Sequence, residues 1–217
     1  MYKACIFDLD GTLTDTLESL TYSVNETLKE LNLPCITRDQ CRAFVGNGAR
    51  YLLESALRAS GDEALLHIEE AMQIYGRIFK QNCTYKVEPY AGIRDMISML
   101  QKEGIKLAVL SNKPHLQTVD VVTTFFGEDT FQMVQGQQEG VPRKPDPTAA
   151  LMIAEKFGVD RTECVYVGDS DVDMQTANAA DMESVGVTWG FRPKEMLLEH
   201  GAKHTIDHPE ELITIVK

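Results

Sequence analysis

The segment CIFDLDGTLTDT, residues 5–16, places two aspartates directly behind an apolar run. In an extended chain, residues two apart lie on the same side, so Asp8 and Asp10 can direct their carboxylates toward one point. Gly11 then allows the chain to turn sharply. The segment therefore predicts a buried strand that ends in an acidic site.

Short apolar runs alternate with helical patterns through most of the remaining chain. The strand-like runs lie at residues 3–10, 105–112, 131–136, 164–169, 184–189 and 204–207. The helical patterns lie at residues 92–104, 114–127, 146–158 and 171–181. This alternation predicts an α/β fold, a Rossmann-like parallel sheet with helices on both faces. Ligands of such sheets bind at the carboxyl ends of the strands, where Asp8 is expected.

Residues 15–82 break the alternation, because their pattern is helical throughout, with the clearest stretches at 17–32, 49–60 and 62–80. We predict an α-helical cap domain, residues 15–82, inserted into an α/β core domain, residues 1–14 and 83–217. Hinges are expected near residues 14–17 and 82–87. A helical subdomain that only adds stability is the alternative, but an insertion directly behind Asp8 favours a lid.

The composition limits the partners and the location. The 217-residue chain has a formal net charge of -12, which argues against nucleic acids and anionic membranes as partners. No apolar run approaches the ~18 residues of a membrane span, and the N-terminus lacks the pattern of a signal peptide. We expect a cytoplasmic protein whose five cysteines, which lack CxxC spacing, are reduced thiols.

A second acidic cluster, VGDSDVDM at residues 167–174, contains Asp169 and Asp173. Together with Asp8 and Asp10, these carboxylates would repel one another at the sheet edge unless a cation lay among them. Hard oxygen ligands without a nearby His or Cys favour Mg²⁺.

Two further segments offer groups that bind anions. VLSNKP, residues 109–114, ends a strand-like run with Ser111 and Asn112 just before an expected helix start. RKPDP, residues 143–147, places Lys144 where it could offset carboxylate repulsion and hold a phosphoryl oxygen. Helix capping by Ser111 and Asn112, and a solvated turn for Lys144, are the structural alternatives.

In their order along the chain, DLDGT, LSN, RKP and GDSDVD resemble the four motifs of the haloacid dehalogenase superfamily. The resemblance covers the whole chain. SNKP, KPDP, VGNGAR and the tail at residues 186–212 are similar to the phosphoglycolate phosphatase branch, which carries an α-helical cap. One departure is Asp181, where that branch usually has glycine at a helix end, so a left-handed backbone conformation is expected there.

The resemblance implies a role for each motif residue. Asp8 would attack phosphorus and become an aspartyl phosphate, while Asp10 would protonate the leaving alcohol and later deprotonate water. Mg²⁺ would be held by Asp8, Asp10 through its backbone carbonyl, and Asp169, with Asp173 in support. The phosphoryl oxygens would be bound by backbone N–H groups of the loop around Gly11 and by three side chains: Ser111, Asn112 and Lys144.

Specificity is expected to come from the cap. Arg50, in VGNGAR, is a candidate for binding a substrate carboxylate or a second anionic group, and a surface arginine is the alternative. His200, His204 and His208 do not share one helix, because Gly201 and Pro209 interrupt it, and we interpret them as surface or tail packing.

The sequence thus predicts a Mg²⁺-dependent phosphatase for a small phosphorylated metabolite, with 2-phosphoglycolate the favoured substrate. A phosphosugar mutase of the β-phosphoglucomutase kind, or a pyrophosphatase or nucleotidase of the same family, is the alternative. A receiver-like signalling domain is disfavoured, because receivers carry their phosphorylated Asp on a middle strand and lack a helical insert. We expect a monomer or a weak homodimer.

Overall fold

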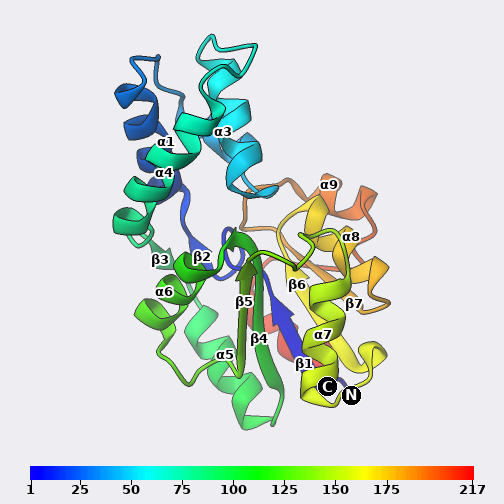
Figure 1. Ribbon diagram of the computed structural model, residues 1–217. Coiled ribbons are helices and arrows are strands. Elements are labelled where there is room, and N and C mark those ends of the chain that lie inside the picture. Colours follow the sequence, from blue (N-terminus) through cyan, green and yellow to red (C-terminus); the bar gives the residue numbers. More distant parts are fainter.

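The computed structural model describes residues 1–217, and a six-stranded parallel sheet forms its centre (Figure 1). The strand order is β5-β4-β1-β6-β7-β8. Its strands are β1 (Ala4–Phe7), β4 (Lys106–Pro114), β5 (Met133–Gln137), β6 (Cys164–Gly168), β7 (Glu183–Val187) and β8 (His204–Ile206). Phe7, the last residue of β1, pairs with Val109 on one side and Val167 on the other. Asp8 therefore leaves the sheet at the middle of its carboxyl edge.

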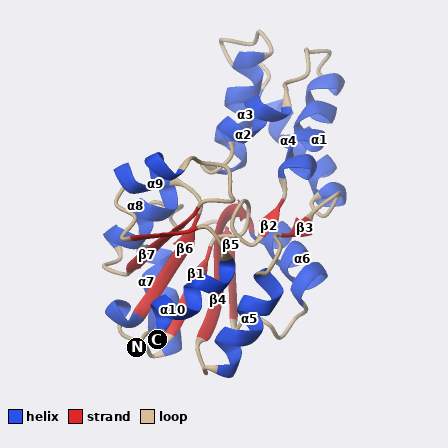
Figure 2. Ribbon diagram, turned by 180° about the vertical axis from the view of Figure 1, so that it is seen from behind, coloured by secondary structure: helices blue, strands red, loops and turns tan.

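Alternate residues of the strands face two different helical layers, as the period of a strand requires. Cys5 and Phe7 pack in one apolar cluster with α5 (Ile93–Lys102), α6 (His115–Phe126) and α10 (Leu212–Val216). Ala4 and Ile6 pack in a second cluster with α7 (Thr148–Phe157) and α8 (Asp171–Ala179). In Figure 2, α5 and α10 lie in front of the sheet. The predicted parallel sheet with helices on both faces is confirmed.

Three short helices complete the core. α9 (Lys194–Glu199) packs against α8, β7 and β8. Two 3₁₀ turns, Arg161–Glu163 and Pro209–Glu211, precede β6 and α10. None of the helices is long and apolar enough to cross a membrane.

The predicted helical insertion lies above the carboxyl edge of the sheet (Figure 1). Its helices are α1 (Leu17–Glu30), α2 (Arg38–Phe44), α3 (Gly48–Ala59) and α4 (Ile68–Asn82). Two strands, β2 (Thr14–Asp15) and β3 (Glu88–Pro89), pair antiparallel where the chain enters and leaves the insertion. A continuous cluster of 37 buried residues extends from the sheet into these helices, so the insertion shares one apolar core with the sheet.

Two details of the helical insertion differ from the sequence pattern. α4 begins at Ile68 rather than at Asp62, because the Asp62 carboxylate accepts hydrogen bonds from the backbone N–H groups of Leu66 and His67 and holds a turn. α2 was not predicted, although Thr37 and Gln40 form a capping box at its start. That Thr-x-x-Gln spacing is a recognisable helix signal.

Asp181, which stands where the phosphoglycolate phosphatase branch usually has glycine, has the expected left-handed backbone conformation. Asp181 follows the end of α8 with φ 57°, in the left-handed region. Asp is less stable than glycine in this conformation, and its carboxylate lies 3.5 Å from Arg161 at the surface.

Candidate active site

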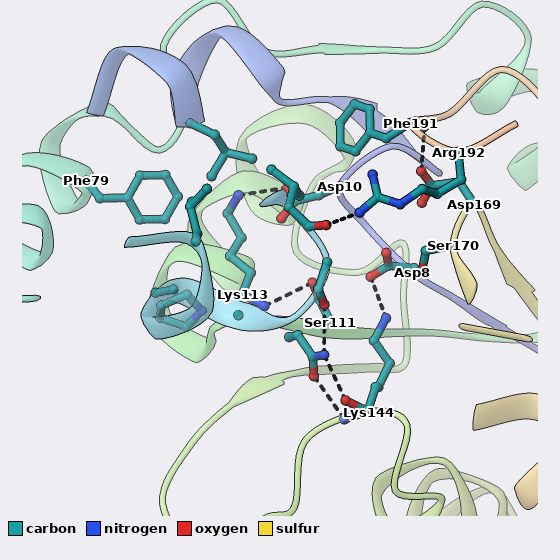
Figure 3. Close-up of a pocket in the computed structure, with 18 of the residues that line it drawn as sticks. Asp8, Asp10, Phe79, Ser111, Lys113, Lys144, Asp169, Ser170, Phe191 and Arg192 are labelled. Atoms are coloured by element: carbon teal, nitrogen blue, oxygen red, sulfur yellow. Dashed lines mark hydrogen bonds and ion pairs between the residues drawn. The ribbon is translucent and has the colours of Figure 1, made fainter. Parts of the chain in front are cut away.

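Most of the predicted site residues meet in one pocket between the carboxyl edge of the sheet and the helical insertion (Figure 3). The predicted residues that line it are Asp8, Asp10, Ser111, Asn112, Lys144 and Asp169. They come from the ends of β1, β4 and β6 and from the loop before α7, as expected for ligand groups at the carboxyl edge of a parallel sheet.

Asp8 lies at the bottom of this pocket, one residue beyond β1. Its backbone N–H donates to the carbonyl of Val167, which extends the pairing of β1 with β6. The Nζ atom of Lys144 lies 2.8 Å from Asp8 Oδ1. Burial raises the pKa of Asp8 to about 7, with Lys144 opposing that rise and Asp173 adding to it. A carboxylate with so high a pKa is poorly stabilised by the protein alone.

Asp169 follows β6 and is enclosed by two glycines. Its carboxylate accepts hydrogen bonds from the backbone N–H of Phe191, at 2.7 Å, and from the Thr12 hydroxyl, at 3.2 Å. A Cβ atom on Gly11, which has φ +87°, would lie 2.3 Å from Asp169 Oδ2. One on Gly190 would lie 2.2 Å from Asp169 Cβ. Burial, then the nearby charges of Asp173 and Asp8, raise the pKa of Asp169 well above its usual value.

Asp173 lies in the first turn of α8 and is fully hydrogen-bonded. Its Oδ2 accepts from the Ser170 hydroxyl at 2.5 Å and the Ser170 backbone N–H at 3.1 Å, which closes a capping box. Its Oδ1 accepts from Lys144 Nζ at 2.7 Å. Asp173 therefore positions the ammonium group of Lys144 beside Asp8.

The three buried carboxylates fit a metal ion. Oxygen atoms of Asp8, Asp169 and Asp173 all lie within 4.8 Å of one another. Asp8 Oδ1 is buried and receives no hydrogen bond, because its ion pair with Lys144 falls outside hydrogen-bond geometry. One lysine cannot balance three buried negative charges, so this cluster can hold a cation that prefers oxygen ligands.

Asp10 has its own cationic partner, Lys113, which sequence reasoning missed. Lys113 Nζ lies 2.8 Å from Asp10 Oδ1, and its side chain is only 1% exposed. The same ammonium lies 4.9 Å from the centre of the Phe79 ring on α4 (Figure 3). A signal was available in the sequence, because Lys113 comes two residues after Ser111 at the end of β4, and both line the pocket.

The Ser111 and Asn112 side chains differ in what they can offer to a ligand. The Ser111 hydroxyl accepts a long hydrogen bond from the Lys113 backbone N–H, at 3.3 Å, and keeps its own proton to donate. The Asn112 amide donates to the carbonyls of Lys144 and Gly46 and accepts from the Lys144 N–H. Asn112 therefore joins the Lys144 loop to the helical insertion.

The structure places Arg50 away from the pocket, contrary to the prediction that it binds substrate. Its guanidinium pairs with Glu69 on α4 at 2.8 Å and is 45% exposed, because the third residue of α3 faces α4 instead of the sheet. Gly46 and Gly48 of the same segment do line the pocket. The arginine that lines it is Arg192, which follows β7 in the tail segment and was not singled out from the sequence.

Comparisons with known proteins agree with this architecture. Residues 5–187 match the haloacid dehalogenase-like hydrolase family. A protein of Colwellia psychrerythraea named phosphoglycolate phosphatase is 31% identical, over 99% of this chain and 97% of its own. A phosphoglycolate phosphatase of Haemophilus influenzae is 30% identical, over 99% and 98% of the two chains.

Solved structures show the same fold. A protein of Lactobacillus delbrueckii superposes with a TM-score of 0.91 and 31% identity, covering 99% of this chain and 98% of its own. A predicted phosphoglycolate phosphatase from Haemophilus somnus superposes with a TM-score of 0.92 and 27% identity, covering 100% and 98%. The family expected from the four motifs is thus confirmed, and the chain belongs to the haloacid dehalogenase-like hydrolases.

Proposed function

We propose that this hydrolase is a Mg²⁺-dependent phosphatase that cleaves a small phosphomonoester through an aspartyl phosphate. The observation that carries the proposal is the pairing of Asp8 with Lys144 beside two further buried carboxylates, Asp169 and Asp173, with Asp10 in the same pocket. A phosphoryl group bound there would meet a nucleophile, a cation and a proton donor together.

Asp8 is the nucleophile in this proposal. One of its carboxylate oxygens forms a bond to phosphorus while the bond from phosphorus to the ester oxygen breaks. Lys144, held by Asp173, stabilises negative charge on the phosphoryl oxygens as they move, and the Ser111 hydroxyl donates to one of them. Most of the catalysis is then positioning and charge stabilisation.

Asp10 moves the proton. It donates to the ester oxygen as the alcohol leaves, and then accepts a proton from the water that attacks the aspartyl phosphate. Water adds to phosphorus, the bond from Asp8 to phosphorus breaks, and phosphate is released. The two steps restore Asp8 and Asp10 to their starting states.

Asp8, Asp169 and the backbone carbonyl of Asp10 would hold Mg²⁺, with Asp173 in support through Lys144. When bound, the ion supplies positive charge that draws the phosphoryl group toward the Asp8 carboxylate. The Oδ1 atom of Asp8, which is buried and has the Lys144 ammonium as a neighbour but accepts no hydrogen bond, fits such an ion.

The favoured substrate is 2-phosphoglycolate, which gives glycolate and phosphate. The relatives named above carry that activity in their names, at 30% and 31% identity over 99% of this chain. The chain as a whole is acidic, yet Lys113, Lys144 and Arg192 line the pocket, which gives a small anion a locally positive site. A cytoplasmic location and a monomeric or weakly dimeric state stay predictions.

The test is hydrolysis by the purified protein with Mg²⁺ of a panel: p-nitrophenyl phosphate, 2-phosphoglycolate, pyrophosphate, nucleotides and hexose phosphates. We expect phosphate release, fastest from 2-phosphoglycolate. Asp8→Asn should lower kcat by roughly three orders of magnitude or more while the circular dichroism spectrum is unchanged. Asp95→Asn, an exposed change on α5, is the matched control. Substantial activity in Asp8→Asn would refute the nucleophile, and conversion of β-glucose 1-phosphate to glucose 6-phosphate would favour a mutase.

A further inference from the structure

Lys113 is a buried cation inside the pocket that the mechanism above does not use. It lies near the end of β4, two residues after Ser111, lines the same pocket, and has a side chain that is 1% exposed. Burying an ammonium is costly unless it is paired, so its place in the pocket needs an explanation. Asp10 is one partner, and we infer that the substrate supplies a second.

The hydrogen bonds of Lys113 leave room for another anion. An ammonium group has three N–H donors. In the structure Lys113 Nζ donates one hydrogen bond, to Asp10 Oδ1 at 2.8 Å. Its other neighbour is the ring of Phe79, at 4.9 Å, which attracts a cation but accepts no conventional hydrogen bond. Two donors remain for a ligand in the pocket.

The position of Lys113 relative to Asp10 indicates which part of a ligand it would meet. Asp10 must reach the ester oxygen in order to protonate it, so a group on the adjacent carbon lies close to both Asp10 and Lys113. Once Asp10 has given its proton to the ester oxygen, a carboxylate there would repel the Asp10 carboxylate unless a cation lay between them. Lys113, already within hydrogen-bond distance of Asp10, can provide that cation.

The walls of the pocket strengthen this pairing. Leu20, Leu52 and Phe79 of the helical insertion line the pocket close to the polar residues of the sheet edge. Apolar walls exclude water, and an ion pair is stronger where water is excluded.

We propose that Lys113 determines specificity for phosphate esters that carry a carboxylate on the carbon bonded to the ester oxygen. This inference rests on the proposed phosphatase function and names its substrate class: monophosphates of short 2-hydroxy acids. Lys113 binds the carboxylate with its two free donors and keeps it apart from Asp10. The cap contributes the face of Phe79, and Arg50 takes no part.

The experiment compares two substrates that differ at one group: 2-phosphoglycolate and 2-hydroxyethyl phosphate, in which a hydroxymethyl group replaces the carboxylate. The quantity measured is the ratio of their kcat/KM values. We expect the wild type to prefer 2-phosphoglycolate at least tenfold. Lys113→Met should lower this ratio by about 10- to 100-fold, the usual size of a hydrogen bond between charged groups, chiefly through KM for 2-phosphoglycolate.

Controls separate this role from a general effect on Asp10. Both substrates need Asp10, so loss of its partner lowers both rates, and only loss of carboxylate binding changes the ratio. Lys80→Met removes an exposed lysine from α4 and should leave the ratio unchanged. Lys113→Arg should keep part of the preference for 2-phosphoglycolate that Lys113→Met loses. If Lys113→Met does not fold, Lys113→Gln, which keeps a donor for Asp10 without the charge, is measured in its place.

The outcomes are distinct. A wild type that cleaves both substrates without preference, or a Lys113 variant that slows both equally, overturns the role of Lys113 and leaves the phosphatase standing. A wild type that cleaves no phosphomonoester of the panel overturns both proposals. The inference is supported if the ratio of the two kcat/KM values falls about 10- to 100-fold in Lys113→Met and is unchanged in Lys80→Met.

Discussion

Asp8 and Asp10 are the same residue type two positions apart, and their neighbours give them different properties. Asp8 is buried beside Asp173 and Lys144, and its pKa is raised to about 7. Asp10 pairs instead with Lys113, a residue 103 positions away in the chain. One carboxylate is thus placed against a cation-binding cluster and the other against a buried ammonium. This difference supports separate roles as nucleophile and proton carrier.

Asp10→Asn should separate the two chemical steps. With p-nitrophenyl phosphate the leaving group is stable without a proton, so the aspartyl phosphate should still form. Its hydrolysis should slow by roughly 10²- to 10⁴-fold, because the attacking water has no base. Stopped-flow absorbance should show a burst of nitrophenol close to one per enzyme. A linear trace at an unchanged rate would argue against the role of Asp10.

Gly11→Ala should damage the acidic cluster. The new Cβ would lie 2.3 Å from Asp169 Oδ2, so the carboxylate must move. Gly61→Ala is the matched control, because Gly61 also has positive φ but has no atom within 4 Å of the added Cβ. Both changes should cost about 1–2 kcal/mol from backbone strain, measured by urea unfolding. Only Gly11→Ala should also lose most of its activity and its response to Mg²⁺.

At the scale of elements, the loop between α2 and α3 is held by side chains of the core. Arg192 donates hydrogen bonds to the backbone carbonyls of Arg42, at 2.7 Å, and Val45, at 2.6 Å. Asn112 donates to Gly46 and Arg143 to Asn47. The last carbonyls of a helix lack partners within it, and the negative end of its dipole favours a cation. All of these hydrogen bonds go to backbone carbonyls, so they hold the loop over the pocket without using its side chains.

Arg192→Met should loosen this loop. The change removes the hydrogen bonds to Arg42 and Val45, each worth about 1 kcal/mol. Backbone amides of residues 45–49 should exchange with deuterium faster, and kcat/KM should fall about tenfold because this loop lines the pocket and would be less ordered around a bound substrate. Arg161→Met, which removes an exposed pair with Asp181, is the control. Unchanged exchange in Arg192→Met would show that other contacts hold the loop.

At the scale of the whole molecule, the acidic cluster couples stability to pH. The folded pKa of Asp8, about 7, lies above the ordinary value of 3.8, so the folded protein binds more protons than the unfolded chain between those values. Stability contributed by Asp8 therefore falls as pH rises from about 4 to about 7. A cation that binds only the folded cluster offsets this loss by mass action.

Asp8→Asn should remove the part of this pH dependence that Asp8 contributes, while Asp169, whose pKa is also raised, keeps its own part. Without Mg²⁺, in the presence of a chelator, the variant should melt at a higher temperature than the wild type at pH 8, and the difference should shrink at pH 5. Carboxylates with lowered pKa, such as Asp146 and Asp160, act in the opposite direction in both proteins and cancel in the comparison. Mg²⁺ should raise the wild-type melting temperature more at pH 8 than at pH 5. If the wild type and Asp8→Asn melted at the same temperature at pH 8 without Mg²⁺, the conclusion that ionised Asp8 destabilises the folded protein would be wrong.

The sequence by itself determined the features that depend on local pattern. Period-two spacing predicted that Asp8 and Asp10 follow a buried strand, and alternating apolar and helical runs predicted the parallel sheet and the helical insertion. Asp169 and Lys144 could be assigned to the same edge, because the carboxyl ends of parallel strands meet there. These inferences need only neighbouring residues and the rule that parallel strands are joined by helices.

Only the tertiary structure decided which side chains meet. It turned Arg50 toward Glu69, brought Arg192 to the carbonyls at the end of α2, and placed Lys113 between Asp10 and Phe79. The Lys113 and Arg192 contacts depend on how the helical insertion packs on the sheet, and the Arg50 contact depends on how α3 packs on α4. A long charged side chain has several rotamers of similar energy, so its partner is set by that packing and cannot be derived from its neighbours in sequence.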